Sequence, residues 1–103
     1  MRRLVVLGCG GYGRVVEDLL AHLGEWEVAG FVDIDTATHG NMVNGVPVLG
    51  GEELIPGLLE QGVSGAVVAI GDNATRARLV DDLASRGFEL PTLVHPRAFV
   101  GRF

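Results

Sequence analysis

Apolar residues form short runs along the chain, each followed by glycine or acidic residues. Unbroken runs, which are typical of parallel strands buried on both faces, occur at residues 4–7, 28–32 and 66–70. Residues 36–45 are polar and rich in turn formers, and Asn44-Gly45 predicts a tight turn before a short strand at residues 46–48. A last strand is expected at residues 92–94.

Amphipathic stretches between these runs predict helices. Residues 11–23 carry apolar side chains at helical spacing and are followed by a glycine, which supplies a C-terminal stop. Residues 51–61 have a similar spacing, but the Pro-Gly pair inside it predicts a short turn and then a stubby helix from Pro56. The last helix is expected to end at about Arg86, directly before another glycine.

The alternation of strands and helices predicts an α/β fold. A Rossmann-like three-layer α/β/α architecture is expected, with a mostly parallel sheet and right-handed crossovers. With 103 residues and no linker or repeat, the chain is expected to form a single domain over residues 1–103.

Charge and composition exclude several partners. A net charge of −5 argues against nucleic acid, whose phosphates require clustered Lys and Arg. The apolar run after Arg2 and Arg3 is too short for a signal peptide, and no run approaches the roughly 18 apolar residues of a membrane span. The lone Cys9 cannot form an internal disulfide and is interpreted as a small residue packed in a turn. We therefore expect a cytoplasmic protein without membrane contact.

A glycine-rich turn follows the first strand. It matches the pattern GxGxxG at the start of a helix, where glycines let the backbone approach a diphosphate and the helix N-terminus stabilises negative charge. The alternative is a turn that serves packing alone. The candidate ligand-binding residues of this turn and of the helix start are Gly8, Gly10, Gly11, Tyr12, Gly13 and Arg14. Arg14 is included because a cation in the first helical turn is unfavourable unless an anion lies nearby.

Two further groups of polar residues follow predicted strands. Asp33 lies twenty residues after the glycine-rich turn, where such folds place an acid against ribose hydroxyls, and Asp35 is the less favoured partner. Gly71, Asp72 and Asn73 follow another strand and are expected at the same sheet edge, facing the ligand. The alternatives are solvated loop acids for the first pair and helix capping for Asp72 or Asn73, although capping would hardly explain both.

Residues for catalysis or metal binding are not evident. His22, His39 and His95 share no close spacing with one another or with Cys9, so no metal site is expected. No nucleophile, base and orienting acid can be assembled from the pattern. The sequence therefore predicts no catalytic residue and no cofactor in this chain.

Five segments together carry a resemblance to a known family. LVVLGCGGYGRVVEDLL, GFVDID, NGVPVLGG, VVAIGDN and LPTLVHPRAFV occur in this order and resemble the N-terminal domain of the NeuD/PglD-type sugar acyltransferases. That bacterial family modifies sialic acids or UDP-linked amino sugars in glycan and protein glycosylation, including pilin glycosylation. Its members join a Rossmann-like domain to a left-handed β-helix that binds acetyl-CoA between the subunits of a trimer.

The resemblance implies roles for the candidate residues. The glycines of the first turn would meet the diphosphate of a UDP-sugar, Asp33 and Asp35 would lie near the uridine, and residues 71–73 would border the sugar. Tyr12 departs from the family, which usually has histidine there. The sequence ends at Phe103, where the family's β-helix would begin, so we expect no acetyl transfer by this chain alone and a monomer or weak dimer.

Two other functions remain open. GxGxxG with an acid twenty residues later is also the fingerprint of an NAD(P)-binding Rossmann domain of an oxidoreductase. A third possibility is a ligand-sensing or structural module whose output is contact with a partner.

Overall fold

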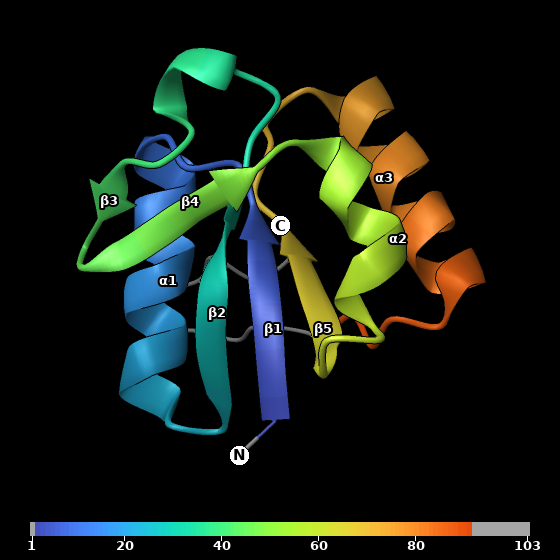
Figure 1. The fold of residues 1–103 in the computed structure, drawn as a ribbon, viewed down its shortest axis with the longest axis horizontal. Helices are drawn as coiled ribbons and strands as arrows, with labels where there is room; N and C mark the ends of the chain where they lie inside the picture. The colour runs from blue at the N-terminus through green and yellow to red at the C-terminus, as the bar shows by residue number, and fades with distance from the viewer. Residues whose placement is uncertain (1, 92–103) are drawn as a thin grey trace.

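The computed structural model describes residues 2–91, which form three layers with helices on both faces of one sheet (Figure 1). In chain order the elements are β1 (Arg2–Leu7), α1 (Gly11–Leu23), β2 (Trp26–Val32), the 3-10 turn η1 (Thr36–Thr38), β3 (Met42–Val43), β4 (Val46–Gly50), the 3-10 turn η2 (Glu52–Leu54), α2 (Ile55–Leu58), β5 (Val63–Val68) and α3 (Asn73–Arg86). The predicted Rossmann-like three-layer fold is therefore confirmed.

The sheet has the strand order β3-β4-β2-β1-β5. β1 pairs in parallel with β2 and with β5, β2 pairs in parallel with β4, and β3 is antiparallel to β4. Asn44 and Gly45 join β3 to β4 with φ of 53° and 78°, as expected for a tight hairpin turn. Because the chain extends the sheet to one side of β1 first and to the other side later, the order reverses at β1, and ligands of such sheets bind at the carboxyl ends of the strands at that point.

Successive residues of β1 enter two separate cores, which explains its unbroken apolar run. Leu4 and Val6 face α1, whereas Val5 and Leu7 face α2 and α3. Figure 1 shows α1 on one side of the sheet and the other two helices on the opposite side. The buried helical side chains that cover the two faces are Val16, Leu19 and Leu20 on the first, and Ile55, Leu58, Leu79 and Leu83 on the second.

Element boundaries differ from the sequence predictions by up to three residues. β1 begins at Arg2 and β2 at Trp26, because the two strands pair from these residues onward although Arg2 and Glu27 are polar. β5 spans residues 63–68 instead of 66–70, since its first residues pair with β1 and with Glu89 and its pairing with β1 ends at Val68. α2 begins one residue before Pro56.

The strict alternation of strand and helix is wrong between β2 and β4, where the chain passes through η1 and β3 instead of an α-helix. The strand predicted at residues 92–94 lies outside the described residues. Within residues 2–91, none of the helices combines the length and the apolar character that crossing a membrane requires.

Candidate functional site

Gly8 and Gly13 of the glycine-rich turn are required by the fold. Gly8 has a φ of 102°, and a Cβ there would lie 2.7 Å from the carbonyl oxygen of Ala69. A Cβ at Gly13 would overlap the carbonyl oxygen of Gly8. Gly13 allows α1 to approach the end of β1 closely, and Gly8 allows the end of β1 to approach Ala69 after β5, so packing alone accounts for both glycines.

Gly10 and Gly11 face open space instead. A Cβ at either residue would meet no atom within 4 Å, and Gly10 has an ordinary φ of −70°. Gly10 is also the N-cap of α1, and no side chain caps this helix. The first N–H groups of a helix need partners from outside it, so this uncapped end can accept an anion.

Asp33, which directly follows β2, forms a hydrogen bond with the glycine-rich turn. Its Oδ2 accepts a hydrogen bond from the Cys9 N–H at 2.9 Å, and its Oδ1 accepts one from the Asp35 N–H at 2.8 Å. His39 Nε2 donates to the Asp33 carbonyl oxygen at 2.7 Å. Burial alone would raise the pKa of Asp33, but the backbone hydrogen bonds from Asp35 and Cys9 outweigh it and hold the pKa below its usual value.

Replacing Asp33 by asparagine is expected to destabilise the chain by about 1–3 kcal/mol at pH 7, because the amide leaves one backbone N–H without an acceptor. The folded pKa of Asp33 is lowered, so its ionisation stabilises the fold above the usual value of 3.8, and this contribution is lost as the pH falls through the folded pKa. Urea denaturation at pH 7 and pH 3 should therefore show the difference between wild type and Asp33→Asn shrinking at the lower pH. The exposed Asp81→Asn variant is the control, and an equal pH effect there would contradict the assignment.

Asp72 and Asn73 both have partners within the first turn of α3. The Asp72 carboxylate caps the helix by accepting from the Thr75 N–H at 2.8 Å, and hydrogen bonds from Thr75 lower its pKa. Asn73 Oδ1 accepts from Arg76 at 2.8 Å. Helix capping therefore accounts for Asp72 and not for Asn73, whose amide oxygen contacts Arg76 instead.

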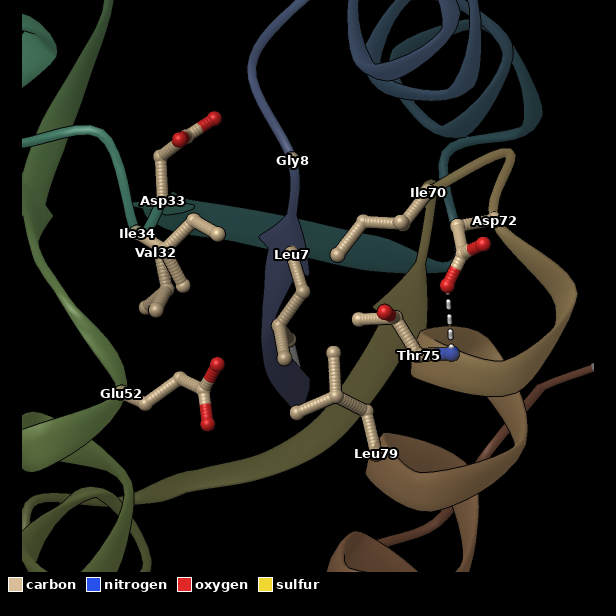
Figure 2. Close-up of a pocket in the computed structure, with 10 residues that line it drawn as sticks. All are labelled: Leu7, Gly8, Val32, Asp33, Ile34, Glu52, Ile70, Asp72, Thr75 and Leu79. Atoms are coloured by element: carbon tan, nitrogen blue, oxygen red, sulfur yellow. Dashed lines mark hydrogen bonds between the residues drawn. The ribbon is translucent and has the colours of Figure 1, made fainter.

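Two pockets open at the carboxyl edge of the sheet. The first, called the apolar pocket, has a volume of about 310 Å³ and is shown in Figure 2. Its lining residues are Leu7, Gly8, Val32, Asp33, Ile34, Glu52, Ile70, Asp72, Thr75 and Leu79. The second, called the polar pocket, has a volume of about 320 Å³. It is lined by Cys9, Gly10, Arg14, Asp33, Asp35, Thr38, Asn41, Met42 and Val43.

The candidate residues are divided between these pockets. Gly8 and Asp72 line the apolar pocket, Gly10, Arg14 and Asp35 line the polar pocket, and Asp33 lines both. The candidates that line neither of the two pockets are Gly11, Tyr12, Gly13, Gly71 and Asn73. Tyr12 is half-buried and packs against the core on the α1 face. The predicted position of these strand-end residues at one edge of the sheet is thus observed, and Asp33 lies between the apolar pocket and the polar pocket.

Arg14 is an exposed cation at the start of α1. Ion pairs among residues 2–91 include Arg2–Glu89, Arg3–Glu27, Arg78–Glu52 and Arg86–Asp82. Arg14 takes part in none of them, although it lies in the first turn of α1, where the helix dipole disfavours a positive charge. The exposed guanidinium and the uncapped helix end together form a local positive site in an acidic protein.

Several lining residues were missed from the sequence. Ile34 lies between two acids, and Ile70 directly precedes the Gly-Asp-Asn segment, so their places at strand ends were a usable signal. Glu52 and Leu79 carried no such signal, because they reach the pocket only when η2 and α3 pack beside the sheet. In the part of the chain that is described, no group of three or more His, Cys, Asp or Glu side chains could hold a metal ion. His95 lies outside that part.

Comparison with known proteins identifies relatives of this chain. A family model for the PglD N-terminal domain matches residues 3–83. A variant of perosamine N-acetyltransferase from Caulobacter crescentus, solved with CoA and GDP-perosamine, is 41% identical with a TM-score of 0.80, and the match covers 93% of this chain and 43% of that one. The acetyltransferase domain of PglB from Neisseria gonorrhoeae FA1090 is 39% identical with a TM-score of 0.76, and the match covers 93% and 45%.

A more distant match shares the fold alone. UDP-D-quinovosamine 4-dehydrogenase from Vibrio fischeri is 16% identical with a TM-score of 0.75, over 86% of this chain and 75% of that one. The search of curated protein sequences found no significant match. The chain spans less than half the length of the two acetyltransferase structures.

Proposed function

The chain belongs to the family of PglD N-terminal domains, and we propose that it binds a nucleotide sugar as the substrate-binding domain of a bacterial sugar acetyltransferase. The observation that carries this proposal is the uncapped N-terminus of α1, where Gly10 and Gly11 leave the backbone open and Arg14 has no ion pair with a described residue. A diphosphate is the ligand group that such a site stabilises best.

The two pockets support one orientation of the ligand. The apolar pocket has aliphatic walls and three carboxylates but no lining cation, so a phosphate is disfavoured there and a nucleobase is favoured. The diphosphate then lies over Gly10 beside Arg14. The ribose lies between them at Asp33, whose carboxylate oxygens accept one backbone hydrogen bond each and retain lone pairs for hydroxyl groups.

The relatives support the same class of ligand. GDP-perosamine and CoA are bound in the Caulobacter crescentus acetyltransferase, and acetyl coenzyme A is bound in the Neisseria gonorrhoeae domain. In our proposal residues 1–103 act as one nucleotide-sugar-binding domain, with Gly8 and Asp72 bordering the ligand in the apolar pocket. Acetyl-CoA would bind elsewhere in a trimeric assembly, and the acetylated sugar would be used in glycan or pilin glycosylation. The nucleotide is a UDP-sugar or a related sugar nucleotide.

Replacing Arg14 by glutamine should change affinity and stability in opposite directions. Loss of the cation is expected to weaken binding of a nucleoside diphosphate by about ten- to a hundredfold, since one charge-assisted contact contributes roughly 1.5–3 kcal/mol. The free chain should become more stable by about 0.3–1 kcal/mol, because an unfavourable charge leaves the helix N-terminus. Isothermal titration calorimetry with GDP and UDP, together with thermal unfolding, measures both effects.

Arg86→Gln is the matched control, because it removes a cation at the far end of α3, where Arg86 pairs with Asp82. This variant should bind like the wild type. Stabilisation of the wild-type chain by NADH but not by nucleoside diphosphates or sugar nucleotides would overturn the proposal in favour of a dinucleotide-binding domain.

A further inference from the structure

One carboxylate extends into the interior of the apolar pocket. Figure 2 shows the Glu52 side chain reaching from η2 toward Leu7 and Leu79, away from the backbone of its own turn. The other two acids that line the pocket accept backbone hydrogen bonds: Asp33 from Cys9 and Asp35, and Asp72 from Thr75. Glu52 is therefore the acid that is placed to contact a ring bound between the aliphatic walls.

Arg78 of α3 orients this carboxylate. Its Nη1 and Nη2 atoms lie 3.2 Å from Oε1 and Oε2 of Glu52, so the planar guanidinium contacts both oxygens. These contacts are longer than the roughly 2.7–2.9 Å of strong charge-assisted hydrogen bonds. The Glu52 side chain is also 32% exposed. A base that donates two hydrogen bonds to this edge of the carboxylate has to replace the guanidinium, and the contacts are long and exposed enough for that exchange.

The donor pattern of the nucleobase decides which ring suits such a carboxylate. Guanine presents N1–H and the N2 amino group side by side, so both can donate to the two oxygens of one carboxylate. Uracil presents a single N3–H between two carbonyl oxygens, and those oxygens repel a carboxylate. Thr75 is the one neutral hydrogen-bonding side chain in the lining, and no lining cation is present to receive the carbonyls.

We infer that the apolar pocket selects guanine over uracil and that Glu52 is the specificity-determining residue. This inference rests on the proposed nucleotide-sugar function and narrows it to guanosine diphosphate sugars. The pocket volume of about 310 Å³ lies at the lower end of the roughly 300–1,000 Å³ of ligand sites, which suits one base and leaves the sugar outside. Arg78 is a positioning residue that acts through Glu52.

Calorimetric titration with GDP, IDP and UDP tests the inference, because the three ligands carry the same diphosphate. The wild-type chain should bind GDP at least about tenfold more tightly than UDP, since one bidentate contact discriminates between bases by that order. IDP lacks the N2 amino group and should fall between them. Glu52→Gln should weaken GDP binding about tenfold and leave UDP binding unchanged, so that the preference disappears.

Two further variants separate base recognition from a structural role of the ion pair. Glu53→Gln alters the neighbouring residue of η2, whose carboxylate accepts from the Gly51 N–H at 3.2 Å, and should keep the preference for GDP. Arg78→Gln removes the ion pair but retains the Glu52 carboxylate, and should also keep most of that preference. A purely structural role predicts equal losses in Arg78→Gln and Glu52→Gln.

The possible failures are distinguishable. Equal affinity for GDP and UDP in the wild type, or an unchanged preference in Glu52→Gln, overturns the assignment of Glu52 while the nucleotide site stands. Absence of binding for all three diphosphates and for their sugar conjugates overturns the proposed function, and the inference with it.

Discussion

Replacing Gly13 by alanine is expected to lower the free energy of unfolding by about 2–4 kcal/mol, a large part of the 5–15 kcal/mol of an ordinary domain. The added Cβ would overlap the carbonyl oxygen of Gly8. That carbonyl cannot move away easily, because the Gly8 N–H is bonded to the Val32 carbonyl oxygen at 2.8 Å and Gly8 itself abuts Ala69. β1 and α1 would therefore have to separate.

Urea denaturation provides the measurement, followed by far-UV circular dichroism and by the fluorescence of the single, buried Trp26. Gly11→Ala is the matched control from the same turn. Its Cβ meets no atom within 4 Å, and its φ is not in the left-handed region, so stability should stay the same or rise by up to about 1 kcal/mol. Equal midpoints for Gly13→Ala and wild type would show that the close approach is not required.

Replacing Gly10 by valine should have the opposite effect to Gly13→Ala, because the fold should be retained and ligand binding should be lost. The backbone there is extended, with φ −70° and ψ −166°, and a Cβ meets open space, so the free energy of unfolding should change by no more than about 1 kcal/mol. The side chain would project over the uncapped helix end that we assign to the diphosphate. Loss of two charge-assisted contacts predicts a fall in affinity of about a hundredfold or more.

Calorimetric titration of Gly10→Val with GDP and UDP measures this effect. Urea denaturation of the same sample checks that the fold is intact. Gly11→Ala, which adds a smaller group, is again the control variant. Wild-type affinity in Gly10→Val would place the diphosphate away from the N-terminus of α1, whatever base the chain prefers.

The glycine-rich turn shows how far sequence reasoning reaches. The pattern of Gly8 to Gly13 after a strand predicted a strand-to-helix turn at the right place, because that signal is local. From this pattern alone, all four glycines were predicted to contact the ligand. Only the structure separates Gly8 and Gly13, which make room for neighbouring backbone, from Gly10 and Gly11, which leave the backbone open.

Asp33 and Glu52 illustrate the same limit for side chains. Asp33 was predicted from its spacing, but its hydrogen bond to Cys9 joins residues 24 positions apart and gives it a role in the fold. Glu52 was not predicted, since its partner Arg78 lies 26 residues further along the chain. Spacing along a strand or helix carries no information about which of these segments will face each other.

The sequence by itself determined the fold class, the types of most elements within the described part of the chain, the glycine-rich turn and the family resemblance. These follow from apolar periodicity and turn chemistry, which act over a few residues, and from the order of the motifs. Only the tertiary structure decided the division of the glycines, the position of Asp33 between two pockets and the Glu52–Arg78 pair. Each of these depends on contacts between segments that the packing of two helical layers on one sheet brings together.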